Sequence, residues 1–182
     1  NQVLESSLGI NWKAEFLSFN FKPIASASIG QVHQAYSDAG DKLAIKVQYP
    51  GIRKSIDSDV DNVGTLLNIV GLIPKSVDYK GLLEEAKKQL HDEADYVREA
   101  DYATRYHNAL KDHSHFVVPK IHPQMSSESV LAMDFIDGVS IEQIEGFDQS
   151  TRDLVMRSLL ELMFRELFDF KMVQTDPNFA NY

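Results

Sequence analysis

The chain has 182 residues, of which 43% are hydrophobic and 25% are charged, a balance typical of one large globular domain or two small lobes. Its 18 Lys and Arg residues are outnumbered by 27 Asp and Glu residues, and the formal net charge of -9 argues against nucleic acid as a partner and against simple electrostatic docking on anionic lipid. The chain has no cysteine, which excludes disulfides and thiolate metal sites. Its longest apolar stretch, residues 63–74, is interrupted and too short to span a bilayer.

Residues 1–20 predict an amphipathic lead-in helix for part of their length, because apolar side chains recur at roughly helical spacing from Leu4 to Leu17. Three strand patterns follow, over residues 21–25, 31–37 and 43–49. The segment 38–41 predicts the turn between the last two, with Gly40 supplying the unusual backbone angle. Lys46 lies inside the third pattern, and a lysine among apolar neighbours needs an anion nearby, for which nucleotide phosphates are suited.

A run of small residues stands between the first two strand patterns, where a kinase carries its phosphate-covering loop: Ala25, Ser26, Ala27, Ser28, Ile29 and Gly30. Kinase glycines let the backbone approach phosphates closely, whereas alanine disfavours positive φ. We therefore expect a stiffer loop that limits how the terminal phosphate is held and restrains turnover. Taken alone, the run would also suit a plain hairpin of small residues.

Two long helices are predicted next, at about residues 52–71 and, from an N-cap at Asp78, at about residues 78–110. The second carries Glu93, Asp95 and Glu99 close together, so a cation should lie near, either Lys46 or magnesium. In one continuous helix Glu93 and Glu99 would be about 120° apart around the axis. Only one can then face Lys46, and we favour Glu99. A solvated acidic helix face is the alternative for this segment taken alone.

Strand patterns at residues 116–121 and 130–135 complete a predicted five-stranded sheet, and a helix is predicted from about Ser150 to Phe170. The chain then reaches Asp176 and Asn181, five apart in a short polar segment. In kinase-like phosphotransferases a carboxylate orients or deprotonates the acceptor hydroxyl, and an amide five residues later holds magnesium. The six histidines form no zinc-ligand pattern.

Four segments together resemble the UbiB/ADCK family of atypical kinases, which is linked to ubiquinone biosynthesis: residues 25–33, 44–51, 93–100 and 174–181. The resemblance runs from about Phe21 to the last residue. It implies an α+β, protein-kinase-like fold in two lobes. Residues 1–133 would form the N-lobe, with a lead-in helix, an inserted helix and a long C-helix, and residues 134–182 the hinge and the start of a helical C-lobe that ends in the catalytic loop.

The resemblance also implies roles for individual residues. Asp176 and Lys46 would be catalytic, Asn181 would bind metal, and ATP or ADP with Mg²⁺ would be the cofactors. The nucleotide would be bound by the small-residue segment and strand around it, by Lys46, by the acidic helix and by the hinge: Ala25, Ser26, Ala27, Ser28, Ile29, Gly30, Gln31, Val32, Glu93, Glu99, Ala132, Met133, Asp134 and Phe135.

The function that the resemblance implies is a magnesium-dependent kinase or ATPase supporting ubiquinone or another isoprenoid-lipid pathway. Its partners would be adenine nucleotide, ubiquinone-biosynthesis proteins and isoprenoid-phenol intermediates, with membrane association through segments absent here. A non-catalytic scaffold switched by nucleotide is the alternative, and the compartment stays open between mitochondrial matrix and bacterial cytoplasm. We interpret the chain as a fragment without the family's K-x-G-Q and D-F-G motifs, and expect it to turn over little by itself.

Overall fold

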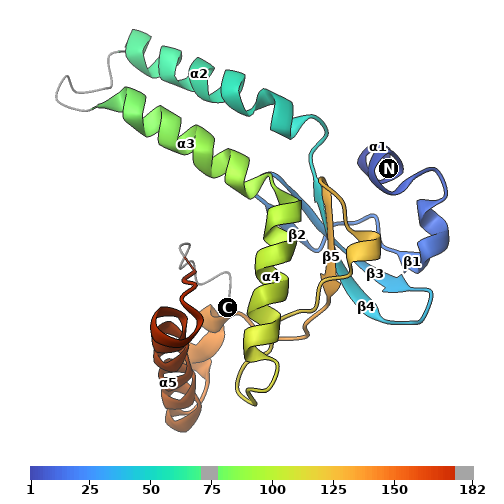
Figure 1. Cartoon of the computed structure of the whole chain (residues 1–182), viewed down its shortest axis with the longest axis vertical. Helices are drawn as coiled ribbons and strands as arrows, with labels where there is room; N and C mark the ends of the chain where they lie inside the picture. The colour runs from blue at the N-terminus through green and yellow to red at the C-terminus, as the bar shows by residue number, and fades with distance from the viewer. Residues whose placement is uncertain (71–77, 175–182) are drawn as a thin grey trace. The chain divides into compact units, whose positions relative to one another are not determined.

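A computed structural model describes residues 1–70 and 78–174 of the chain (Figure 1). The chain divides into two compact units, one made of Asn1–His107 with Val118–Phe135 and the other of Asn108–Val117 with Ile136–Tyr182. The described elements follow one another as α1 (Gln2–Leu8), η1 (Trp12–Glu15), β1 (Phe16–Phe19), β2 (Ala25–Ala27), β3 (Gly30–Ser37), β4 (Lys42–Gln48), α2 (Ile52–Val70), α3 (Tyr79–Glu93), α4 (Tyr96–Leu110), η2 (Pro123–Met125), β5 (Val130–Asp134), η3 (Ile141–Gly146), α5 (Gln149–Arg165) and η4 (Glu166–Phe170).

The first unit is built on a five-stranded antiparallel sheet in the order β1-β3-β4-β5, with β2 also paired to β3. Gly30 begins β3, and a Cβ at this position would lie 2.4 Å from the backbone oxygen of Val47 in β4. Gly40 has a φ of +90° in the turn between β3 and β4, as the sequence predicted. The α+β fold class that the sequence predicted is confirmed.

Two apolar cores cover the two faces of this sheet. Alternate strand residues face each side, because side chains in a strand point alternately to opposite faces. The first core lies on the side of α1 and η1: Leu4, Trp12, Phe16, Ala35, Leu43, Ile45, Met125, Val130 and Ala132. The second core lies on the side of α4: Ile29, Ile56, Ala94, Tyr96, Ile121 and Leu131.

Two of the five strands differ from those that the sequence predicted. The first strand is Phe16–Phe19, in a segment that we expected to be helical, and the predicted strand at residues 21–25 is reduced to Ala25–Ala27. Trp12 explains the error, because its buried ring makes edge contacts with Phe16 and Phe19, and this aromatic cluster mimics helical spacing. Residues 116–121 are irregular apart from one bridge between Ile121 and Met133, and Pro119 in this segment has no N–H to donate to a ladder.

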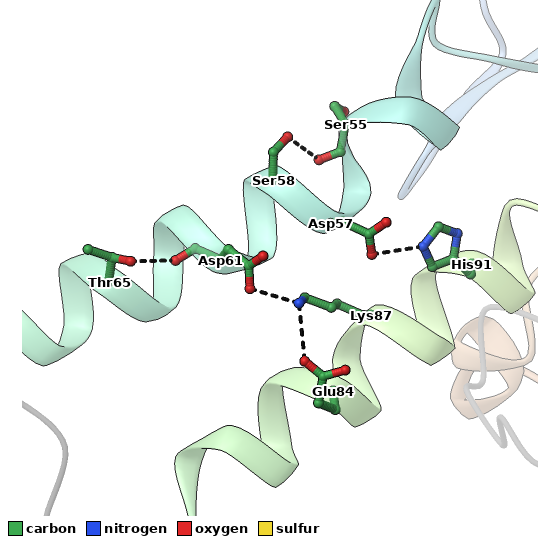
Figure 2. A network of polar contacts seen from close by, with 8 residues as sticks. All are labelled: Ser55, Asp57, Ser58, Asp61, Thr65, Glu84, Lys87 and His91. Atoms are coloured by element: carbon green, nitrogen blue, oxygen red, sulfur yellow. Dashed lines mark hydrogen bonds and ion pairs between the residues drawn. The ribbon is translucent and has the colours of Figure 1, made fainter.

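The two helices after β4 lie side by side as an antiparallel hairpin (Figure 1), and α2 matches the predicted bounds closely. Two polar contacts join them, as Figure 2 shows: His91 Nε2 lies 3.1 Å from Asp57 Oδ1, and Lys87 Nζ lies 2.7 Å from Asp61 Oδ1. Within α3, Lys87 Nζ also lies 3.1 Å from Glu84 Oε1. The hydrogen bond to Asp61, followed by that to Glu84, raises the pKa of Lys87 above its ordinary value. The hairpin is thus fixed by charge as well as by packing.

The single helix predicted over residues 78–110 is wrong, because it is broken between α3 and α4. Ala94 N still donates to Leu90 O at 2.9 Å, but Arg98 N donates to the side chain of Asp95, at 3.0 Å, instead of continuing the helical ladder. The oxygen of Ala94 accepts from Gln48 Nε2 at 2.7 Å. Asp95 therefore acts as the N-cap of a new helix, a role for which aspartate is well suited.

The second unit contains η3, α5 and the π-helical turn η4 that continues α5. The N-cap of α5 is Asp148, two residues before the predicted start of the helix, and its carboxylate accepts a hydrogen bond from Thr151 N at 3.0 Å. Hydrogen bonds from the hydroxyl of Ser150, then from the backbone and hydroxyl of Thr151, lower the pKa of Asp148 well below its usual range. Within residues 1–70 and 78–174, no helix combines the length and apolarity needed to cross a bilayer.

Candidate functional site around Lys46 and Glu99

The centre of the candidate site is an ion pair between the sheet and the helix that covers it. Lys46 of β4 lies with its Nζ 2.9 Å from Glu99 Oε1 and 3.1 Å from Oε2, so both carboxylate oxygens accept from the ammonium. The side chain of Lys46 is 17% exposed and that of Glu99 is 36% exposed. Of the two glutamates that the sequence offered, Glu99 is the one that contacts Lys46.

Tyr96, one helical turn before Glu99, lies beneath this pair. Its ring centroid is 4.9 Å from Lys46 Nζ, within cation–π range, and its side chain is fully buried. The phenol oxygen has no hydrogen-bond partner among the described residues. Burial raises the pKa of the Tyr96 phenol, and the negative charges of Glu99 and Glu93 raise it further. Tyr96 thus offers Lys46 a neutral aromatic surface.

Glu93 lies on the other side of the helix break, at the end of α3, and contacts the small-residue loop. The hydroxyl of Ser28 donates to Glu93 Oε1, which connects the turn between β2 and β3 to the helical layer. Ile29 in the same turn is buried in the second core, and its oxygen accepts from Tyr49 N at 2.9 Å. The loop is therefore anchored by the hydrogen bond of Ser28 to Glu93 and by the packing and backbone hydrogen bond of Ile29.

The strand residues expected to contact nucleotide do not all share one face. Val32 pairs with Lys46 across β3 and β4, so the two side chains lie on the same face of the sheet. Gln31 pairs with Val47 and lies on the opposite face, where both line a cavity of about 280 Å³ with Phe19 and Phe21. Gln31 is therefore not brought together with Lys46.

In the predicted hinge segment, Ala132–Phe135, two backbone N–H groups donate to oxygens within the first unit. Asp134 N donates to Lys120 O at 2.9 Å, and Phe135 N donates to Lys42 O at 3.0 Å. The ammonium of Lys42 lies 3.9 Å from the ring centroid of Phe135, which holds the end of the hinge against β4. These two N–H groups are not open to an adenine in this structure.

The side chains of the hinge residues divide between the two faces of the sheet. Met133 pairs with Ala44 and lies on the face of Lys46, at the edge of the second core, whereas Ala132 is fully buried in the first core. Asp134 accepts from the ring of His122, whose Nε2 lies 2.7 Å from Asp134 Oδ1. Met133 thus shares a face of the sheet with Lys46, whereas Ala132 does not.

Three residues of this region were missed by the sequence reasoning: Tyr96, Gln48 and His122. A signal existed for Gln48, because it stands two residues after Lys46 on the same strand and must share its face. Tyr96 stands three residues before Glu99, a spacing that places two helical side chains on one face. For His122 we find no signal, since its contact depends on an irregular segment that sequence patterns do not describe.

The predicted catalytic and metal-binding residues Asp176 and Asn181 lie outside the described residues. No cluster of three or more histidine, aspartate or glutamate side chains suited to a metal is formed by residues 1–70 and 78–174. The roles of these two residues stay predictions.

An antiparallel five-stranded sheet with an inner-strand lysine paired to a glutamate on its covering helix defines a protein-kinase-like protein. The chain belongs to the family of the ABC1 atypical kinase-like domain, whose sequence model matches residues 1–182. The resemblance to UbiB/ADCK atypical kinases is thereby confirmed.

Similar proteins include atypical kinases from animals and fungi. The mitochondrial atypical kinase COQ8B of Danio rerio is 39% identical over 182 residues, covering 100% of this chain and 29% of the relative. The mitochondrial atypical kinase COQ8 of Saccharomyces cerevisiae is 36% identical over 181 residues, covering 100% of this chain and 36% of the relative. The chain thus spans about a third of the length of these curated relatives.

A solved structure has the same fold. The Mycobacterium tuberculosis protein Rv3197, solved as a complex with erythromycin, superposes with a TM-score of 0.82 at 31% identity, covering 99% of this chain and 46% of that protein.

Proposed function

We propose that this chain forms the nucleotide-binding part of a magnesium-dependent atypical kinase or ATPase that supports ubiquinone biosynthesis. The observation that carries the proposal is the ion pair of Lys46 with both carboxylate oxygens of Glu99. In protein kinases a strand lysine paired in this way must be in place for phosphoryl transfer.

The residues present suit a magnesium–nucleotide complex. Lys46 is mostly buried yet retains exposed surface, and its ammonium has a third N–H beyond the two that Glu99 accepts. A nucleotide phosphate is an anion that such a group can bind with charge-assisted hydrogen bonds. Val32 and Met133 lie on the same face as Lys46 and provide apolar surface for a base.

Each residue would have a separate task. Lys46 would hold the α- and β-phosphates, Glu99 would orient Lys46, Asp176 would orient or deprotonate the acceptor hydroxyl, and Asn181 would hold magnesium. When bound, the magnesium nucleotide supplies the transferable phosphoryl group and the charge neutralisation that the reaction needs. The anchored alanine-rich turn, held through Ser28 and Glu93, restrains turnover relative to a glycine-rich loop.

The test is a thermal-shift titration with Mg-ATP, Mg-ADP and Mg-GTP. We would use this chain and a longer form carrying the D-F-G segment that the family resemblance implies, each beside its Lys46→Met variant. A ligand at 100 times its Kd stabilises the folded state by about 2.7 kcal/mol, so binding raises the midpoint. We expect an adenine-selective, magnesium-dependent rise that is lost in Lys46→Met.

A second arm separates chemistry from a nucleotide-switched scaffold. Asp176→Asn should retain the nucleotide-dependent rise in the midpoint but lose phosphate release. If no nucleotide raises the midpoint of either form of the protein, the proposal fails, and so does the alternative of a scaffold switched by nucleotide. If nucleotide binds but phosphate release is absent from the longer form, the scaffold is the better account.

A further inference from the structure

Gln48 links the strand of Lys46 to the point where the helical layer is broken. Its side chain is 3% exposed, and its Nε2 donates to the oxygen of Ala94 at 2.7 Å. Ala94 is itself fully buried, so this carbonyl has no access to water. Leaving a buried carbonyl without a donor costs free energy, so this contact favours the position of the helical layer in which Gln48 reaches Ala94.

Gln48 binds the peptide between the end of α3 and the start of α4. The break at this peptide sets the directions in which Glu93 and Glu99 project. In a continuous helix the oxygen of Ala94 would accept from Arg98 N. Here Arg98 N donates to Asp95 Oδ1, and the freed oxygen is taken by Gln48. Glu93 therefore ends α3, whereas Glu99 lies in the first turn of α4.

Two residues of β4 attach the helical layer at two places. Lys46 and Gln48 lie on the same face, two residues apart, a distance of about 6.6 Å along a strand. Lys46 contacts Glu99 in the first turn of α4, and Gln48 contacts Ala94 in the break just before α4. With one contact on the helix and one at the peptide that leads into it, the strand limits both the height and the rotation of α4.

We propose that Gln48 is a positioning residue for the nucleotide site, which holds α4 in the register that presents Glu99 to Lys46. The proposal rests on the proposed function for its effect on nucleotide, but the positioning itself concerns only Gln48, Lys46 and Glu99. One residue of helix turns a side chain by about 100°, so a slip of α4 by a single residue would remove Glu99 from Lys46.

The informative substitution is Gln48→Met, which keeps the length of the side chain and removes the donor. Gln48→Asn, which is one methylene too short to reach Ala94, serves as a second variant if Gln48→Met does not fold. The matched control is His107→Leu. His107 Nδ1 also lies 2.7 Å from a backbone oxygen, that of Val118, and it anchors the same helix away from Glu99.

The first readout needs no nucleotide. In a chain with ¹³C-labelled lysine, the ε-methylene signal of Lys46 is identified by its loss in Lys46→Met, and Glu99→Gln supplies the position of that signal without the ion pair. We expect Gln48→Met to move the Lys46 signal most of the way to the Glu99→Gln position, while His107→Leu leaves it near the parent position. A folded Gln48→Met or Gln48→Asn whose Lys46 signal stays at the parent position overturns the proposal.

The second readout is the Kd for Mg-ATP in whichever form of the protein binds it. Loss of a buried hydrogen bond is typically worth about 1 kcal/mol, so we expect Gln48→Met to bind on the order of fivefold to tenfold more weakly. In a Glu99→Gln background the same substitution should change the Kd by less than about twofold, because the group it positions is already gone. An equal loss in both backgrounds, or an equal loss in His107→Leu, means that Gln48 acts through general stability and overturns the proposal.

The two proposals fail differently. If the parent protein binds no nucleotide but the Lys46 signal moves as expected, the proposed function fails and the positioning role of Gln48 stands. If nucleotide binds and the signal does not respond to Gln48, the proposed function stands and the positioning role fails.

Discussion

Removing either partner of the Lys46–Glu99 pair should have unequal effects on stability, because the two side chains differ in exposure. Glu99→Gln leaves an ammonium that is only 17% exposed with a neutral partner, whereas Lys46→Met leaves a carboxylate that is 36% exposed and can be hydrated. We therefore expect Glu99→Gln to lower the free energy of unfolding and Lys46→Met to leave it nearly unchanged.

The magnitude follows from the contacts that are lost. Hydrogen bonds to charged groups contribute about 1.5–3 kcal/mol when partly buried, and the side-chain amide introduced by Glu99→Gln would keep one bond from the ammonium, so we expect a net loss of about 1–2 kcal/mol for this variant. With a urea m-value of about 2 kcal/mol/M for a protein of this size, the midpoint should fall by about 0.5–1 M. The double variant should have nearly the same free energy of unfolding as Lys46→Met, because Glu99 then has no ammonium to pair with.

The assay is urea unfolding at neutral pH followed by tryptophan fluorescence. Trp12 is the single tryptophan of the chain and is 1% exposed in the core of the first unit, so it reports the unfolding of the unit that holds the pair. The reasoning is refuted if Lys46→Met is as destabilising as Glu99→Gln, or if the losses of the single variants add in the double variant.

Substitutions at four further positions have defined outcomes. Gly30→Ala should destabilise the first unit by about 1–3 kcal/mol in the same fluorescence assay, because its Cβ would lie 2.4 Å from a backbone oxygen of β4, and an unchanged midpoint would contradict the packing at this position. Ala27→Gly should speed phosphate release by relaxing the turn, and a rate no faster than the parent's would count against that hypothesis. Tyr96→Phe should leave the urea midpoint unchanged or slightly higher, because the Tyr96 hydroxyl has no partner among the described residues. Tyr96→Leu should lower the free energy of unfolding by about 2–3 kcal/mol, because it removes a buried ring that contacts Lys46. Equal losses in the two variants would show that the hydroxyl is hydrogen-bonded. The pKa of Asp148 is lowered in the folded state, so its contribution to α5 is present above the unfolded pKa of about 4 and is lost as pH falls through the folded pKa. Circular dichroism melts of the parent and Asp148→Ala should therefore differ at pH 6, and this difference should begin to narrow only below about pH 4 and shrink progressively with further acidification. A difference that grows on acidification would have the wrong sign.

The sequence was sufficient for the parts of the fold whose pattern is local. The strands around Lys46 and the helix after it follow from alternation and from helical periodicity, and their bounds agree with the structure to within a few residues. The turn at Gly40 follows equally from one residue's backbone preference. Such features depend on residues that are neighbours in the chain, so they can be predicted from a local sequence pattern.

The errors occur where a distant residue overrides the local pattern. Residues 78–110 have a continuous helical pattern, but the helix is broken at Ala94, whose carbonyl accepts from the side chain of Gln48, 46 residues earlier in the chain, instead of from Arg98 N. Likewise, β1 forms in place of a helix because Trp12, Phe16 and Phe19 pack as an aromatic cluster. The choice of Glu99 over Glu93 agrees with the contact observed, but the argument that only one of them could face Lys46 assumed a continuous helix that does not exist.

The break between α3 and α4 explains how one acidic segment can serve two parts of a nucleotide site. On a straight helix Glu93 and Glu99 would be about 120° apart around the axis, so only one of them could face the sheet beside Lys46. With the break, Glu93 accepts a hydrogen bond from the hydroxyl of Ser28 in the small-residue turn, and Glu99 forms the ion pair with Lys46. The turn is therefore attached to Glu93 before Ala94, and the strand lysine to Glu99 after it, while Gln48 binds the oxygen of Ala94 itself. A change that moves this peptide must alter the turn and the ion pair together, which is why the coupling between Gln48 and Glu99 tests the architecture of the site more directly than the loss of either residue alone.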